Sequence, residues 1–265
     1  MASEMIFIGV IRMNKNKRVG EVNISNENYK MKIVEYNDTH NLLVEFQDEY
    51  KAIVHTNYQA FKKGEVKNPY HPSVYGVGYY GQGKYKSREN NRKTKIYGYW
   101  VNMFQRCYDP YFLDKHPTYR DCIVCNEWHC FQNFAKWYED NYYAYNEEKM
   151  CLDKDILIKG NKVYSPETCI FVPERINSLF VKCDAKRDNL PIGCSHLKGV
   201  IRVDCQTLET PIYLGCFSID RPFQAFTVYK NFKEKYIKEI ADEYKNLIPK
   251  KLYDAMYKYE VEIND

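Results

Sequence analysis

The sequence predicts an α+β protein assembled from small modules along the chain. Near the N-terminus, short β-branched segments alternate with turn formers. In the middle, aromatic residues recur at helical spacing, and near the C-terminus three short strands precede one long amphipathic helix. With 265 residues, of which 45% are hydrophobic, the chain is long enough for about two or three small cores.

Residues 1–66 are expected to form a small β-barrel. The segments 31–36, 41–46 and 51–56 are short and β-branched, and turn formers lie between them. About five strands in this length are typical of a small antiparallel barrel. In shape it resembles a Tudor-type barrel.

Residues 67–95 are expected to form a connector that is rich in glycine, proline and tyrosine and then becomes basic, with Glu89 as its single acid in the basic part. Cations beside tyrosines favour a path for a nucleic-acid backbone. The alternative is a solvated linker without a binding role. The predicted DNA contacts in this segment are Lys84, Lys86, Arg88, Arg92 and Lys93, and Lys95 belongs to the same basic run.

Residues 96–182 are expected to contain two amphipathic helices, followed by a strand at 150–152, a second strand at 169–172 and a helix from about Pro173. A β-hairpin followed by a helix is a ββα unit. The first helix carries its apolar face on Tyr97, Trp100, Phe104 and Cys107, and the second on Trp128, Phe131, Phe134, Trp137 and Tyr138.

Several motifs in this region resemble those of phage-encoded HNH endonucleases. They are W-x-x-M-x-x-R-C-Y (100–108), C-x-V-x-x-x-W-x-x-F-x-x-F (122–134), L-D-K-D (152–155) and Y-S-P-E-T-C-x-F (164–171). The resemblance implies a central ββα-metal domain of the His-Me finger type, with flanking helices and metal-dependent DNA cleavage. It places Asp153 and Asn177 at the metal-binding positions and Asn161 in the connecting loop.

The chain departs from the family at Lys154, which occupies the position of the catalytic histidine. The oxygens of Asp153 and Asn177 suit Mg²⁺ or Mn²⁺. A protonated Lys154 would hold the scissile phosphate rather than accept a proton. In the family, the histidine acts as the base that activates water. Its role is assigned here either to Tyr164, as nucleophile or base, or to His129 or His116. The alternative is a purely structural role. In that case Asp153 and Asn177 stabilise the hairpin against the helix, and Tyr164 is an ordinary aromatic residue of a turn.

Zinc is not expected. Cys122 and Cys125 form one C-x-x-C pair with His129 and Cys130 just after it, but no second pair exists to complete a four-ligand site. The cysteines are instead interpreted as reduced thiols, mostly small core side chains.

Residues 190–265 resemble the apetala-type DNA-binding domain of plant ethylene-response factors, on the G-C-S, K-G-V-I-R-V and Y-L-G-C-F segments and the helix that follows. The resemblance implies a three-stranded sheet in the major groove. Strand alternation directs Ile201 and Val203 to the helix and leaves Arg202 and Lys198 outward as DNA contacts. Asp204 departs from the arginine-rich pattern. A non-binding interaction domain is the alternative.

Taken as a whole, the sequence indicates a cytoplasmic phage or mobile-element protein that binds double-stranded DNA without a membrane segment. The formal net charge of +4 is compatible with a polyanionic partner. The first expectation is a metal-dependent endonuclease or nickase with sequence preference. The alternatives are a catalytically degenerate DNA-binding protein and an anti-defence interaction protein. A homodimer is left open.

Overall fold

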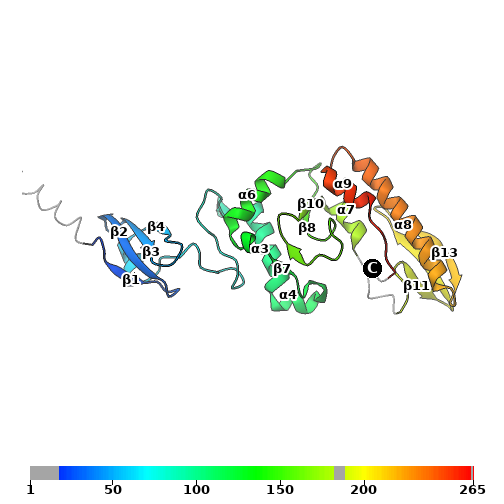
Figure 1. The fold of residues 1–265 in the computed structure, drawn as a ribbon, viewed down its shortest axis with the longest axis horizontal. Coiled ribbons are helices and arrows are strands. Elements are labelled where there is room, and N and C mark those ends of the chain that lie inside the picture. Colours follow the sequence, from blue (N-terminus) through cyan, green and yellow to red (C-terminus); the bar gives the residue numbers. More distant parts are fainter. Residues whose placement is uncertain (1–17, 182–188, 264) are drawn as a thin grey trace, which may run out of the picture. The chain divides into compact units, whose positions relative to one another are not determined.

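The computed structural model describes residues 18–181, 189–263 and 265. The α+β class is confirmed, because helices occur together with several small antiparallel sheets (Figure 1). The chain divides into two compact units, one formed by residues up to 120 with 124–136, the other by 121–123 with 137–265. The predicted boundary between the central and C-terminal modules falls at 182–188, outside the described residues.

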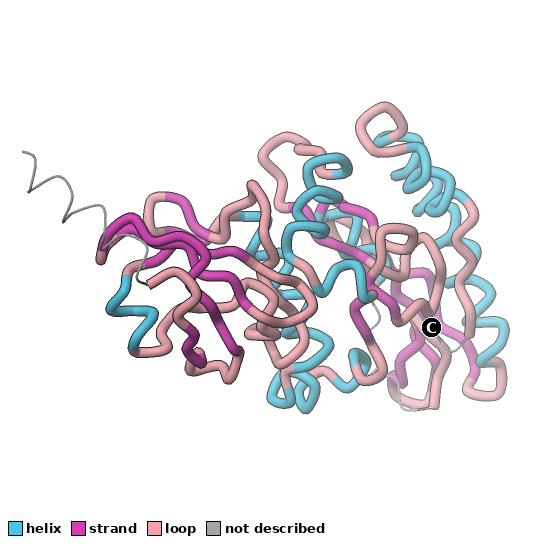
Figure 2. The backbone as a smooth tube through the Cα atoms, turned by 60° about the vertical axis from the view of Figure 1, so that its left-hand side comes forward, coloured by secondary structure: helices cyan, strands magenta, loops and turns pink. Residues whose placement is uncertain are grey.

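An antiparallel sheet in the order β1-β2-β3-β4 opens the first unit (Figure 1 and Figure 2). Alternate residues of β2 and β3 face the core, as the period of two requires. Its strands are β1 (Val22–Ile24), β2 (Lys30–Asp38), β3 (Asn41–Phe46) and β4 (Ile53–Thr56), and a short helix, α2 (Tyr58–Lys62), follows. The buried core is Met31, Ile33, Leu42, Val44, Phe46, Ala52, Phe61 and Val66.

The predicted barrel is wrong, since no barrel is closed in the described residues. A barrel would require β1 to pair with β4. Instead, α2 interacts with β1: Asn23 Nδ2 donates to the carbonyl oxygens of Phe61 at 2.7 Å and Lys62 at 3.1 Å. The sheet therefore stays open, and α2 supplies Phe61 to its core.

The helices that follow in the chain pack on aromatic side chains. Trp100 Nε1 donates to the Trp128 carbonyl oxygen at 2.8 Å, with both indoles fully buried. The predicted second helix is interrupted at Cys130, whose backbone is extended and bridges to Tyr79. The helices are α3 (Lys95–Tyr108), α4 (Pro110–Lys115), α5 (Asn126–His129) and α6 (Phe131–Asn141), the last of which continues into the second unit.

The segment 67–95 is packed rather than solvated along its middle part. The amide of Tyr79 donates to the His129 carbonyl, and the amide of Phe131 donates to the Tyr79 carbonyl. A methyl group on Gly81 would lie 2.5 Å from Cys130 Sγ, so only glycine allows this approach. The basic end forms a small hairpin, β5 (Arg88–Glu89) and β6 (Arg92–Lys93).

In the second unit, β8 (Met150–Asp153) pairs antiparallel with β10 (Ile170–Pro173), and α7 (Glu174–Asn177) follows at once. Between them lies β9 (Val163–Tyr164), which pairs with β7 (Ile123–Val124). The sheet order β11-β12-β13 comes next in the chain. Its elements are β11 (Cys194–Leu197), β12 (Val200–Gln206), β13 (Pro211–Ser218), α8 (Pro222–Tyr244) and α9 (Lys250–Tyr257).

Helix α8 is shared by two cores, as its length allows. Its N-terminal half packs Phe226 and Tyr229 on the inner face of the β11–β13 sheet, against Ile201 and Val203. Its C-terminal half belongs to a second core with residues of β10, α7 and α9, namely Ile170, Val172, Ile176, Ile237, Ile240, Ala241, Leu252 and Met256. The hairpin and the three-stranded sheet are therefore attached to one helix.

Within the described segments, no helix has the length and apolar character that a bilayer crossing demands.

Candidate functional site

Asp153 ends strand β8 and already binds part of the following loop. Its Oδ1 accepts hydrogen bonds from the amides of Asp155 at 2.9 Å and Ile156 at 2.7 Å. Among the residues that the structure describes, Oδ2 has no hydrogen-bond donor. One carboxylate oxygen therefore fixes the loop, and the other remains available to a ligand.

The electrostatic surroundings of Asp153 oppose its ionisation. Burial of the carboxyl group raises its pKa, and the nearby Asp155 carboxylate raises it further, against the lowering effect of the two amides and of Lys154. A bound cation would favour the ionised form.

Asn177 ends α7, which packs against both β8 and β10. The side chain is half-buried, and within the described segments its amide makes no hydrogen bond. Carboxylate and amide oxygens, the groups that Asp153 carries on β8 and Asn177 on the adjoining helix, are ligand types that Mg²⁺ and Mn²⁺ accept.

Lys154 and Tyr164 lie inward. Lys154 is 7% exposed and Tyr164 1% exposed. The Lys154 Nζ lies 3.5 Å from Asp155 Oδ2 and 5.9 Å from the centroid of the Tyr164 ring. Contact of either side chain with a DNA phosphate would require the loop between β8 and β10 to move, so burial weighs against Tyr164 as nucleophile.

The predicted loop residue Asn161 braces the backbone. Its Nδ2 donates to the carbonyl oxygens of Lys154 and Val163, both at 2.7 Å. Of the two candidate bases, the His129 Nε2 lies 3.1 Å from the Val124 carbonyl oxygen, and His116 packs on Phe112 with ring centroids 4.3 Å apart.

The described residues contain no group of three or more His, Cys, Asp or Glu side chains arranged to hold a metal ion. A site built from one aspartate and one asparagine is smaller than such a group. At Cys122, burial raises the pKa of the thiol.

On the C-terminal sheet, Ile201 and Val203 are fully buried toward α8, as strand alternation predicts. The guanidinium of Arg202 points to the opposite face, where Asp204 binds it: Nε lies 2.7 Å from Oδ2 and Nη2 2.9 Å from Oδ1. The Tyr213 ring centroid lies 5.3 Å from Arg202 Cζ. Arg202 therefore lies on the outer face of the sheet, where its guanidinium is already paired with the Asp204 carboxylate of the same strand.

Lys198 is exposed in the turn between β11 and β12 and has a φ of 44°, next to Gly199 at 83°. A two-residue turn with positive φ at both positions is typical of a tight hairpin. The turn presents the lysine ammonium at the end of the sheet.

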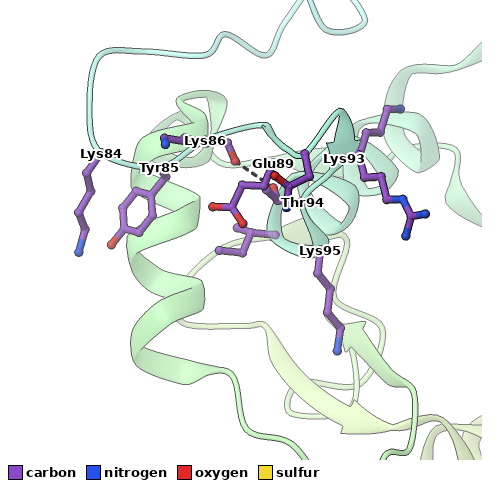
Figure 3. Close-up of a pocket in the computed structure, with 10 residues that line it drawn as sticks. Lys84, Tyr85, Lys86, Glu89, Lys93, Thr94 and Lys95 are labelled. Carbon is purple, nitrogen blue, oxygen red and sulfur yellow. Dashed lines mark hydrogen bonds between the residues drawn. The ribbon is translucent and has the colours of Figure 1, made fainter.

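The predicted basic contacts gather around a cavity of about 740 Å³ in the first unit, the basic cavity, between the β5–β6 hairpin and the start of α3 (Figure 3). Lys84, Lys86, Arg92 and Lys93 line it, whereas Arg88 does not. Figure 3 shows Tyr85 and Lys95 on opposite sides of the cavity. The remaining lining residues are Glu89, Asn90, Thr94 and Ile96.

Sequence reasoning missed Thr94 as a part of this site, whereas Tyr85 is one of the tyrosines on which the expected nucleic-acid path rests. Local signals for the shape of the segment were present. Asn90 and Asn91 have φ of 48° and 61°, the conformation of a tight hairpin turn that Asn-rich pairs favour. Thr94 caps α3, with its Oγ1 accepting from the Tyr97 amide at 3.3 Å.

No family model, curated protein or solved structure matches the chain in the comparisons with known proteins.

Proposed function

We propose that this protein binds double-stranded DNA and cleaves or nicks it with Mg²⁺ or Mn²⁺ held by Asp153 and Asn177. The observation that supports this most directly is the β8–β10–α7 arrangement, an antiparallel hairpin followed at once by a helix. It presents an uncommitted carboxylate oxygen on the strand and an uncommitted amide on the helix among the described residues. The proposal includes the finer fold that the motifs imply, a ββα-metal finger.

The cation would stabilise negative charge on the leaving 3′-oxygen of a phosphodiester. Asp153 and Asn177 would bind and orient the ion, and the carboxylate must be ionised to do so. Lys154 would hold a phosphate once the loop opens. In the proposal, the C-terminal sheet is the apetala-type reader, with Arg202 and Lys198 facing the duplex and the basic cavity providing further phosphate contacts.

The test is nicking of supercoiled plasmid in Mg²⁺ or Mn²⁺ by the full chain. Wild type is expected to convert plasmid to open circles, and Asp153→Ala to abolish conversion. Glu209→Ala serves as the control, because its carboxylate is exposed in the turn between β12 and β13, outside the β8–β10–α7 arrangement. Equal nicking by wild type and Asp153→Ala would contradict the proposal. A Tyr164→Phe protein that nicks at the wild-type rate would remove the nucleophile role.

A second candidate function is DNA binding without cleavage. The burial of Lys154 and Tyr164 favours it, since neither group reaches the surface. This alternative predicts duplex binding that is independent of divalent ions and of Asp153. The third possibility, a factor that blocks a host defence enzyme, predicts no duplex binding at physiological salt.

A further inference from the structure

The basic cavity of the first unit is lined by more cations than carboxylates. Five of its ten lining residues are cations, and Glu89 is the one carboxylate among them. Over the described ranges, the side chains of Lys86, Arg92 and Lys93 form no ion pair. An anion from outside would complete this arrangement.

The backbone that forms the cavity wall is held in place by neutral groups. Buried Gln132 binds Tyr85 on both sides, accepting from its amide and donating to its carbonyl, each at 3.0 Å. The Tyr80 hydroxyl donates to the same carbonyl at 2.6 Å, and Thr94 Oγ1 donates to the Lys86 carbonyl at 2.9 Å. The wall is therefore prepared before any ligand arrives, which lowers the ordering cost of binding.

The size of the cavity selects the class of ligand. About 740 Å³ lies within the range of small-molecule sites, roughly 300–1,000 Å³. A duplex, whose major groove alone is about 12 Å wide, could touch only the rim. A nucleotide freed from base pairing could enter.

An aromatic face completes the site. The half-buried Tyr85 ring borders the cavity, and the Lys84 Nζ lies 4.8 Å from its centroid. Proteins that bind single strands combine such a ring, on which a base stacks, with cations that follow the backbone.

We infer that this cavity binds unpaired single-stranded nucleic acid, with successive phosphates along Lys86, Lys93 and Lys95 and a base on the Tyr85 ring. The inference rests on the nucleic-acid binding proposed above and adds a substrate class to it. It gives the protein a place for a strand displaced or frayed from the duplex.

The experiment is fluorescence anisotropy of the full chain with a short labelled oligothymidylate. Lys86→Ala combined with Lys93→Ala is expected to weaken binding by about tenfold or more and to make the salt slope shallower by about 1.4, which is about 0.7 for each phosphate that is no longer neutralised. Lys30→Ala with Lys32→Ala is the matched control, since both are exposed lysines of β2 in the same unit, and it should change affinity by less than about twofold.

The Tyr85→Leu variant tests base stacking independently of phosphate binding. It should weaken oligothymidylate binding by about tenfold, the effect of losing one stacked base, while inorganic phosphate still competes in the same concentration range. Oligothymidylate binding that is unaffected by either substitution would overturn the inference, as would inorganic phosphate binding as tightly as the oligonucleotide.

Duplex binding and plasmid nicking, measured on the same variants, distinguish the two proposals. Loss of single-strand binding with nicking intact supports the cavity site. Absence of single-strand binding in a wild-type protein that nicks plasmid contradicts only the cavity. Absence of nicking with single-strand binding retained contradicts only the nuclease.

Discussion

The side chain of Gln132 holds the backbone of Tyr85 by two hydrogen bonds of 3.0 Å each, so a residue at the start of α6 fixes the wall of the basic cavity. Gln132→Ala would leave the Tyr85 amide without its acceptor. Loss of a buried partner of this kind costs about 1–3 kcal/mol. The free energy of unfolding, measured in urea, should fall by that amount. Asn133→Ala, which removes an exposed hydrogen bond one residue away, should cost clearly less.

Substitution by alanine should change the stability of the protein in opposite directions at Gly81 and at Gly98. A methyl group at Gly81 meets Cys130 Sγ at 2.5 Å in a backbone with a φ of 71°, whereas one at Gly98, inside α3, meets nothing within 4 Å. Gly81→Ala is expected to lower the melting temperature. Gly98→Ala is expected to raise stability by about 0.5–1 kcal/mol through helix propensity. Thermal melts that gave both variants the same sign would contradict the packing of this segment.

The buried ammonium group of Lys233 should make the stability of the protein depend on pH. Lys233 is 7% exposed on α8, and burial lowers the pKa of its ammonium below the ordinary value of 10.5. Because the unfolded chain holds this proton more tightly, wild-type stability should rise as pH increases from the lowered folded pKa to 10.5. Lys233→Met removes the buried charge and should add roughly 1 kcal/mol at pH 7, the low end for replacing buried ions by apolar groups.

The advantage of Lys233→Met should shrink as the pH approaches 10.5, and denaturant titrations at several pH values measure it. Lys235→Met, at an exposed position of the same helix, is the control and should show neither effect. A constant difference across this pH range would contradict the assignment to a buried charge.

Asp204 should restrain DNA binding by Arg202, because it already occupies the guanidinium. Asp204→Ala frees one cation on the outer face of the sheet. Duplex affinity should rise, and the salt slope should steepen by about 0.9 for one more neutralised phosphate. Arg202→Ala should weaken binding relative to Asp204→Ala. Anisotropy with a labelled duplex checks both, and unchanged slopes would remove this face from the duplex interface.

Local patterns predicted much of the fold. The strands expected at 150–152 and 169–172 lie at Met150–Asp153 and Ile170–Pro173, because short apolar runs between turn formers have few alternatives. The long C-terminal helix was predicted from its apolar face. The barrel failed at α2, where the Asn57 side chain caps the helix by accepting from the Ala60 amide, a local signal that was overlooked.

Long-range packing could not be predicted from local patterns. Nothing in the sequence near Lys154 indicates that it folds inward over the Tyr164 ring, because that packing depends on how the loop between β8 and β10 closes. The division of α8 between two cores also arises from residues far apart in sequence. The basic run was predicted to contact nucleic acid, but the wall that makes it concave is held by Gln132, 47 residues from Tyr85.

Titration of Mn²⁺ into the full chain, followed by electron paramagnetic resonance of the free ion, tests the central claim most directly. One Mn²⁺ is expected to bind per wild-type chain, with binding lost in both Asp153→Asn and Asn177→Leu and retained in Glu209→Gln, an exposed carboxylate between β12 and β13. Unchanged Mn²⁺ binding in Asp153→Asn and Asn177→Leu, or no binding by the wild type, would contradict a divalent ion shared by β8 and α7.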